Sequence, residues 1–187
     1  SMSTIAARLG GSKATLYKYF TSKEELFQAV MQRKSQAVIG PLEELADRST
    51  DPETLLRAFG MIFLTRLCQP DALDIHRTVH GEGQRFPEVA RTFFAYGPDA
   101  AYALLTPALE RFHHEGQIDC PDPRLAAEQF FAMVRGDIHL RVSSGLVPPP
   151  SEAEIARQVN HAVGIFVRRL ARRDRPARTR PAPPNPP

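Results

Sequence analysis

The residues best suited to binding chemistry gather near the start of the chain. Lys13, Lys18 and Lys23 are three of the four lysines in the sequence, and they recur every five residues. Lysine side chains neutralise the phosphates of nucleic acid and release condensed counterions. Thr15 and Tyr17 lie between the lysines, and their hydroxyl and aromatic groups can contact base edges. This combination of residue types predicts a surface that binds double-stranded DNA.

A helix-turn-helix is the element that would position these side chains. Apolar residues fall on one face of residues 2–9, which indicates a short helix, and Gly10 and Gly11 end it because glycine accepts a left-handed cap. Ser12 is suited to cap a second short helix over residues 13–20. Two short helices joined by a tight turn form the DNA-binding helix-turn-helix. Lysines on a short helix can also be only a solvated face, but the turn, the spacing and the basic head agree on DNA binding.

The charge distribution supports the same interpretation. Residues 1–40 hold six Lys or Arg and two Asp or Glu, a balance of +4. Residues 41–160 hold eleven and eighteen, a balance of −7, and residues 161–187 hold seven and one, a balance of +6. A basic head attracts a polyanion, whereas the acidic middle does not. The Arg- and Pro-rich residues 174–187 are expected to be a disordered tail, which either adds non-specific attraction to DNA or only aids solubility.

The rest of the chain is predicted to be helical, since no stretch alternates apolar and polar residues as a strand does. Thr21 or Ser22 caps a third helix, which we expect to run past Lys34 and to end or kink at Gly40-Pro41. Further helices are predicted over residues 52–68, 71–81, 87–95, 97–115, 123–143 and 151–173. The fold class is therefore all-α.

The first thirty residues closely resemble the N-terminal domain of TetR-type (tetracycline-repressor-like) transcriptional regulators. The resemblance covers residues 3–31, STIAARLGGSKATLYKYFTSKEELFQAVM. It includes an Ile-Ala pair at 5–6, a Gly-x-Ser turn at 10–12, a Leu-Tyr-x-Tyr-Phe run at 16–20 and Lys-Glu-Glu-Leu at 23–26. Members of the family carry one more helix before this point, which packs on the helix-turn-helix, so we expect the first helix to be missing here.

The resemblance implies the positions that face DNA. This set consists of Thr4, Ser12, Lys13, Ala14, Thr15, Tyr17, Lys18, Tyr19 and Lys23. It also implies three parts of the chain: a DNA-binding domain over 1–40, a helical ligand-binding and dimerisation domain over 41–173, and the tail over 174–187. Residues 85–136 further resemble the C-terminal domain of AefR-like regulators, a resemblance that names no ligand.

A ligand pocket is expected within the helices of the body, because helix bundles place ligand sites between helices. Aromatic residues at helical spacing are more often ordinary core, so polar groups within these helices are the better candidates. The candidate pocket residues are Phe63, His76, Arg77, His80, Phe94, Tyr102, Phe131 and His139. The expected occupant is a small-molecule effector that is at least partly apolar.

Metal and cofactor chemistry have little support. His76 and His80 are four residues apart, which is metal-ligand spacing, but no third ligand follows in a known pattern. No nucleophile elbow, P-loop or Gly-x-Gly-x-x-Gly stretch occurs, so the sequence predicts no catalytic residues, no cofactor and no enzyme. No signal peptide or apolar run long enough for a membrane span is present, and Cys68 and Cys120 lie far apart, which favours a cytoplasmic location.

The last two predicted helices, 123–143 and 151–173, carry small residues that allow close approach and are expected to form a homodimer. Dimerisation would let two reading helices meet successive major grooves about 34–36 Å apart on a palindromic operator. The favoured function is therefore a ligand-responsive transcriptional regulator, most simply a repressor. The alternative is a helical binding or scaffold module that retains a remnant of a DNA-binding head.

Overall fold

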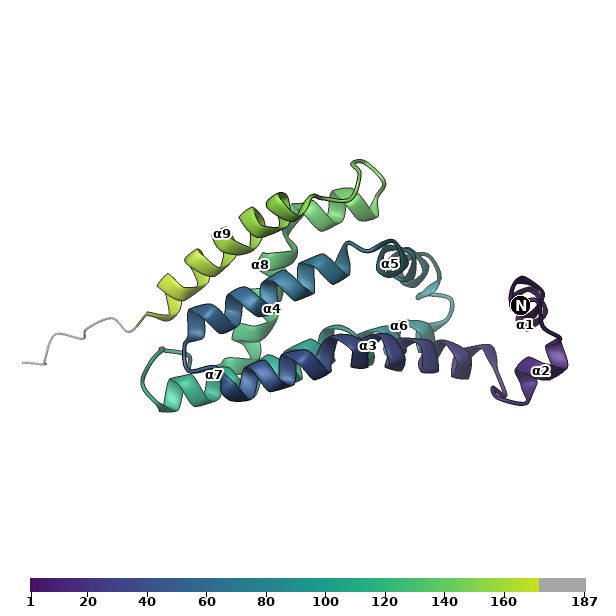
Figure 1. Cartoon of the computed structure of the whole chain (residues 1–187), viewed down its shortest axis with the longest axis horizontal. Helices are drawn as coiled ribbons and strands as arrows, with labels where there is room; N and C mark the ends of the chain where they lie inside the picture. Colours follow the sequence, from purple (N-terminus) through teal and green to yellow (C-terminus); the bar gives the residue numbers. More distant parts are fainter. Residues whose placement is uncertain (172–187) are drawn as a thin grey trace, which may run out of the picture.

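The structure is a computed structural model that describes residues 1–171. This part of the chain is helical, as predicted, and contains no strand. The helices, labelled in Figure 1, are α1 Met2–Arg8, α2 Lys13–Tyr17, α3 Lys23–Arg48, α4 Pro52–Leu67, α5 Pro70–Glu82, α6 Pro87–Tyr96, α7 Pro98–His114, α8 Pro123–Ser143 and α9 Glu152–Leu170.

Two predictions concern residues that the structure does not describe. The last helix was expected to extend to residue 173, and the described part of α9 ends at Leu170. The expected disordered tail over 174–187 lies wholly outside the described residues.

Side-chain caps begin several helices where the sequence predicts them. Ser12 Oγ accepts a hydrogen bond from the backbone N–H three residues on, at 3.0 Å, and so begins α2. Of the two candidates for the third cap, Ser22 accepts from the Glu25 amide at 3.1 Å. Ser151 and Glu154 form the reciprocal capping box at the start of α9. These contacts are local, which is why the sequence alone locates them.

The turn between α1 and α2 depends on Gly10. Its φ of +69° lies in the left-handed region, which glycine adopts without steric cost. The Gly11 amide then donates to the Ala6 carbonyl at 3.0 Å, which closes the end of α1. The second helix is shorter than predicted, because α2 ends at Tyr17 and the chain turns before α3.

The third helix is longer than predicted. It does not end at Gly40-Pro41 but continues as α3 to Arg48. Its second half is fixed by the body: Leu42 and Ala46 are buried at 4% and 6% exposure. Arg111 of α7 also donates to the Ala46 carbonyl at 2.9 Å. These distant contacts outweigh the local helix-breaking preference, so the expected domain boundary at 40/41 falls inside one continuous helix.

The body is a bundle whose core lies between α4, α7, α8 and α9. Figure 1 shows α9 running alongside α4, while α3 passes on the other side of α4 and packs on α6 and α7. Phe59, Phe112 and Phe130 come from three different helices of the bundle and are fully buried. Burying one such side chain contributes about 1.5–3 kcal/mol. The helix-turn-helix lies at the far end of α3, away from this core (Figure 1).

One helix of the body is broken. Gly136 has φ +50° and ψ −162°, so α8 consists of two helical segments that meet at this residue. Two of the small residues on the helices expected to form the dimer, Ala127 and Ala162, pack within the subunit, since they are buried at 0% and 1% exposure in the bundle core.

Candidate functional site

The first candidate surface is the exposed face of α2. Lys13, Ala14, Thr15 and Tyr17 are all exposed, whereas Leu16 is half-buried and faces inward. The Lys13 ammonium lies 5.6 Å from the centre of the Tyr17 ring, which keeps both groups on one outer face. Ser12 is also exposed, but its hydroxyl already caps the helix and lies 2.8 Å from the Thr15 hydroxyl. This pair holds the first turn of α2.

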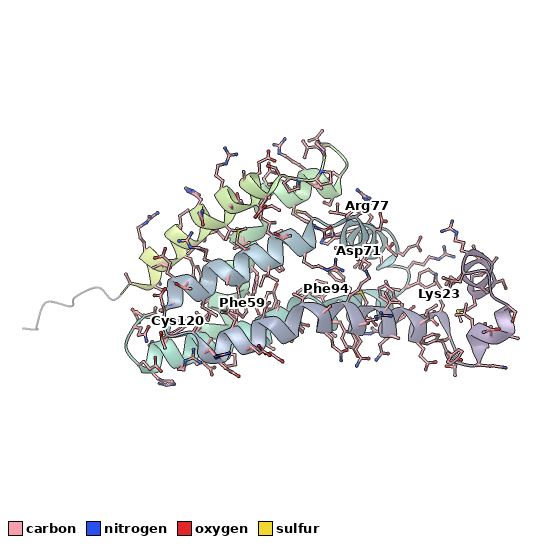
Figure 2. All side chains as sticks on the ribbon, viewed as in Figure 1. Lys23, Phe59, Asp71, Arg77, Phe94 and Cys120 are labelled. Carbon is pink, nitrogen blue, oxygen red and sulfur yellow. The ribbon has the colours of Figure 1, made fainter. Side chains whose placement is uncertain are left out.

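The remaining predicted DNA-facing residues surround α2. Thr4 is exposed on α1, Lys18 directly follows α2, and Tyr19 is 73% exposed. Lys23 is the first residue of α3 and lies at the end of this helix that is nearest the helix-turn-helix (Figure 2). No carboxylate of residues 1–171 pairs with Lys13, Lys18 or Lys23. The head therefore offers cations that are free to meet phosphates.

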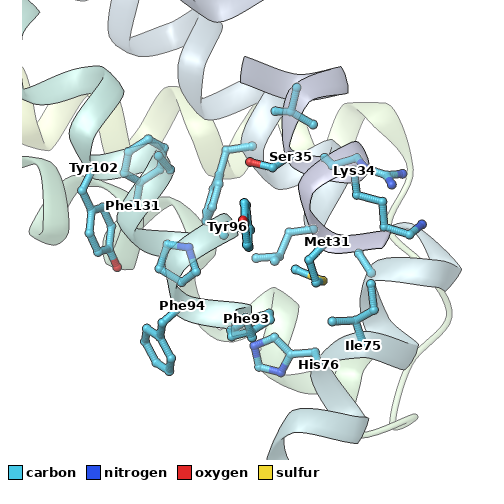
Figure 3. Close-up of a pocket in the computed structure, with 18 of the residues that line it drawn as sticks. Met31, Lys34, Ser35, Ile75, His76, Phe93, Phe94, Tyr96, Tyr102 and Phe131 are labelled. Atoms are coloured by element: carbon cyan, nitrogen blue, oxygen red, sulfur yellow. The ribbon is translucent and has the colours of Figure 1, made fainter. Parts of the chain in front are cut away.

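The second candidate site is a cavity of about 290 Å³ in the body. Its walls come from six helices, α3 to α8 (Figure 3). The walls are mainly apolar and aromatic. Phe131 forms the centre of one wall, with ring centroids 4.7 Å from Phe63 and 5.9 Å from Tyr102. Phe93 and Phe94 of α6 meet edge to face at 5.6 Å on another wall. Such a lining suits an apolar or aromatic small molecule.

Three histidines stack beside the cavity. The His76 ring lies 4.5 Å from the His80 ring and 4.6 Å from the His139 ring, measured between centroids. Burial, together with electrostatic repulsion from His139, His80 and Arg135, lowers the pKa of His76 to about 4. Burial likewise lowers the pKa of His139 to about 4. Both rings are therefore neutral at pH 7, and His139 Nε2 is buried without a hydrogen-bond partner.

A shared carboxylate links three walls of the cavity. Asp71 of α5 pairs with Lys34 of α3 and, at 2.8 Å, with Arg66 of α4. The hydrogen bond from Lys34 is the main cause that lowers the pKa of Asp71 to about 2. Lys34 and Arg66 line the cavity, whereas Asp71 is not part of the lining. The ion-pair cluster thus connects α3 to α4 and α5 of the body.

The structure brings together six of the eight predicted pocket residues. The cavity is lined by Phe63, His76, His80, Phe94, Tyr102 and Phe131. His139 is not part of the lining and packs behind His76. Arg77 is not part of the lining either: its Nε donates to the Ser143 carbonyl at 3.0 Å, and its guanidinium pairs with Asp74.

Several lining residues were not predicted. Lys34, Ser35 and Val38 of α3 recur at helical spacing with Met31 and Leu42, and this stripe was a detectable signal. Arg66, Tyr96 and Arg135 lie on three other helices, and nothing local in the sequence marks them. Only the packing of the helices brings them to one cavity.

Metal and thiol chemistry find no site in the part of the chain that the structure describes. No group of three or more His, Cys, Asp or Glu side chains there could hold a metal ion. This applies also to His76, His80 and His139, although their rings lie close together. Cys68 and Cys120 are free buried thiols whose pKa values are raised by burial. Among residues 1–171, no helix is both long enough and apolar enough to cross a membrane.

Comparison with known proteins covers both candidate sites. Residues 1–30 match the family model for bacterial regulatory proteins of the tetR family. Residues 54–172 match the model for the C-terminal domain of AefR-like transcriptional repressors. Over 57 residues the chain is 40% identical to the HTH-type transcriptional activator FasR of Mycolicibacterium smegmatis. That alignment covers 30% of this chain and only 26% of the activator.

Two solved structures resemble nearly the whole chain. A TetR-family transcriptional regulator from Mesorhizobium loti superimposes with a TM-score of 0.79 at 25% identity, covering 92% of this chain and 87% of that one. The flavonoid-responsive regulator FrrA superimposes with a TM-score of 0.73 at 31% identity, with the same coverage. The resemblance therefore includes the head, the long helix and the body together.

Proposed function

Because the chain belongs to the TetR family of bacterial transcriptional regulators, with an AefR-like C-terminal domain, we propose that it is a ligand-responsive repressor. It would bind a palindromic operator as a homodimer and release it when a small molecule enters the cavity. The observation that carries this proposal is the continuity of α3. One end of α3 follows the helix-turn-helix directly, and the stripe from Met31 to Leu42 lines the cavity.

In this proposal the exposed face of α2 reads the operator. Lys13, Lys18 and Lys23 would meet phosphates, which supplies affinity without sequence preference. Thr15 and Tyr17 would lie near base edges in the major groove. Thr4, Ser12, Ala14 and Tyr19 complete the proposed contact surface. Operator binding implies a cytoplasmic location.

The homodimer would form through the outward faces of α8 and α9. Val159, Val163 and Phe166 are buried within the subunit, so they cannot contribute to a dimer interface. Leu125 and Leu140 of α8 and Ile165 of α9 remain exposed, at 46%, 62% and 38%, and offer apolar contacts for a partner. Two-fold symmetry would then set the distance between the two reading helices.

The matched relatives support repression as the direction of regulation and an aromatic compound as the effector. The AefR-like model is described as a repressor domain and covers residues 54–172, whereas the match to an activator covers only 30% of the chain. The regulator FrrA, described as flavonoid-responsive, is 31% identical over nearly the whole chain. An aromatic effector also agrees with the Phe-rich walls of this cavity. A ligand can shift the heads only if it binds their two spacings with different affinity.

The test is operator binding as a function of salt. An operator is first selected from random-sequence duplexes with the protein, and its Kd is then measured between 50 and 200 mM salt, a range over which roughly 10³-fold or more is lost when six or more phosphates are contacted. Lys23→Ala removes one proposed phosphate contact, so we expect the slope of log K against log salt to fall by about one unit.

The matched control is Arg48→Ala, which removes an exposed cation from the opposite end of the same helix. We expect this variant to keep the full slope. If the protein binds no duplex at any salt concentration, the proposal of an operator-binding repressor is wrong and the helical-module alternative takes its place.

A further inference from the structure

The cavity lining carries positive charge without carboxylates. None of the 26 residues that line it is Asp or Glu, although residues 41–160 hold eighteen acidic side chains against eleven basic ones. Three lining residues, Lys34, Arg66 and Arg135, are cations. In an acidic body, a lining that contains only cationic charges indicates selection for an occupant of negative charge.

Two of these cations are partly neutralised, and the third is not. Lys34 and Arg66 share Asp71, which is not part of the lining. Arg135 has neither an ion pair nor a hydrogen bond with any side chain of residues 1–171. Its charge nevertheless reaches the cavity wall, because it lowers the pKa values of His76 and His139. Arg135 is therefore the free cation of this site.

Two carboxylates near Tyr102 are already paired with another cation. Burial is the main cause that raises the pKa of Tyr102, and the charges of Glu128 and Asp99 raise it further. Both of them pair with Arg124, at 2.8 and 3.3 Å respectively. Neither pairs with Arg135, so an anion that enters the cavity would meet an unpaired guanidinium that lines the cavity and is also open to solvent. A guanidinium can hold a carboxylate by two charge-assisted hydrogen bonds.

The shape and the apolar lining of the cavity indicate what the uncharged part of the ligand is. Phe63, Phe93, Phe94 and Phe131 offer ring faces and edges that suit a flat ring system. A volume of about 290 Å³ lies at the small end of ligand sites, which span roughly 300–1,000 Å³. The site thus fits a compact ring system better than a long chain.

We propose that the effector of this regulator is a compact aromatic carboxylate, with its ring system between the Phe walls and its carboxylate held by Arg135. This inference rests on the proposed ligand-responsive function and names the chemical class of the ligand. Arg135 then determines the preference for a carboxylate over a neutral ligand of the same shape, because its guanidinium binds the negative charge that the neutral ligand lacks.

The test compares three probes of the same shape. Binding of 2-naphthoate, 2-naphthamide and 2-naphthylmethylamine to the protein is measured by calorimetry at pH 7.5. We expect the carboxylate to bind roughly tenfold more tightly than the amide, and the amine to bind no better than the amide. Arg135→Gln should reduce the affinity for the carboxylate to that for the amide and leave the amide unchanged.

Two variants control for non-specific effects. Arg141→Gln removes a cation from the same helix that pairs with Asp137 and does not line the cavity, so it should leave all three affinities unchanged. Arg135→Lys keeps the charge but loses the bidentate fork, so it should retain part of the preference for the carboxylate. Thermal unfolding of each variant shows whether it is folded.

Three outcomes overturn the inference: equal binding of amide and carboxylate, an unchanged preference in Arg135→Gln, or no binding of any probe. The proposed function is tested separately by operator binding in the absence of probes. If operator binding holds and a neutral flavonoid releases the operator, the function stands and the anion assignment fails. If the carboxylate binds as expected but no duplex does, the anion site stands and the operator-binding function fails.

Discussion

At the scale of single residues, His139 is the side chain that departs furthest from ordinary behaviour. It is the buried polar residue of the described chain, at 2% exposure, and its Nε2 has no hydrogen-bond partner. Such an unsatisfied group costs about 1–3 kcal/mol. Packing against His76 places it directly behind the cavity wall, so its charge state affects both stability and the polarity of the site.

We expect the stability of the protein to fall as the pH decreases from about 6.5 to 4. The pKa of His139 is lowered from 6.5 to about 4 in the folded state, so the unfolded chain takes up the proton first. Folding stability contributed by the neutral ring is present above pH 6.5 and is lost across this window. The loss for His139 is of the order of 2–3 kcal/mol, and His76 adds to it in the same direction.

Urea unfolding at pH 7.5, 6 and 5 measures this dependence. His139→Phe, which replaces the ring with an apolar one of similar size, should flatten part of the slope without loss of stability at pH 7.5. His161→Gln changes an exposed histidine and should leave the slope unchanged. If the free energy of unfolding depends on pH equally in His139→Phe and in the parent protein, protonation of His139 is not the cause of the pH dependence.

At the scale of elements, the break in α8 is the least regular feature of the body. Gly136 interrupts the helical hydrogen bonds, and Gln158 of α9 compensates by donating from Nε2 to the Met133 carbonyl at 3.0 Å. The break changes the direction in which the second segment presents its side chains, and His139 belongs to that segment. Arg135, the free cation of the cavity, directly precedes the break.

Gly136→Ala should destabilise the protein by about 2–4 kcal/mol. The backbone at φ +50° and ψ −162° is one that only glycine adopts readily, and such strain costs about 1–3 kcal/mol. An added Cβ would also lie 2.5 Å from Gln158 Nε2, which displaces the compensating donor. Gly145→Ala is the matched control: its φ is +72°, but open space surrounds it, so only about 1 kcal/mol should be lost. Equal urea midpoints for the two variants would show that the close approach of the added Cβ to Gln158 does not destabilise the protein.

At the scale of the whole molecule, α3 connects the two candidate sites. Near its start, Gln28 donates to the hydroxyl of Tyr96 at 3.2 Å, and the Tyr96 ring lines the cavity. Further along, Lys34 pairs with Asp71 of α5. In Figure 1 the head lies beyond the start of α3, so these two polar contacts add to the packing of α3 on α6 and α7 in fixing the direction of the helix. A ligand that displaces Tyr96 would loosen the first of them.

We expect Tyr96→Phe to loosen the first turns of α3 while the bundle core stays intact. The variant keeps the ring but removes the acceptor for Gln28, and one neutral hydrogen bond contributes about 1 kcal/mol. Amide hydrogen exchange at residues 23–30 should become about fivefold faster, with α4 unchanged. Gln28→Ala should give the same pattern, whereas Tyr19→Phe, which alters an exposed ring of the head, should not. Unchanged exchange in both α3 variants would show that this contact does not hold the helix.

The features that the sequence determined by itself depend on neighbours within a few residues. Gly10 sets the turn of the helix-turn-helix, Ser12 caps α2, and Ser151 with Glu154 caps α9, because each interaction closes within one helical turn. The all-α class and the helix-turn-helix follow from the same local signals, and the resemblance of residues 3–31 to a known family identified the head as TetR-type. Amphipathic spacing likewise predicted most helix positions, since one face of each helix must be apolar.

The features that only the tertiary structure decided depend on residues far apart in the chain. The continuity of α3 through Gly40 rests on core contacts and on Arg111, 65 residues from the Ala46 carbonyl to which it donates. The break in α8 rests on Gln158 of another helix. Arg77 and Arg135 look alike in the sequence, yet packing leaves only Arg135 lining the cavity. Local propensity cannot anticipate such choices, because the energy that decides them comes from contacts that exist only once the helices have assembled.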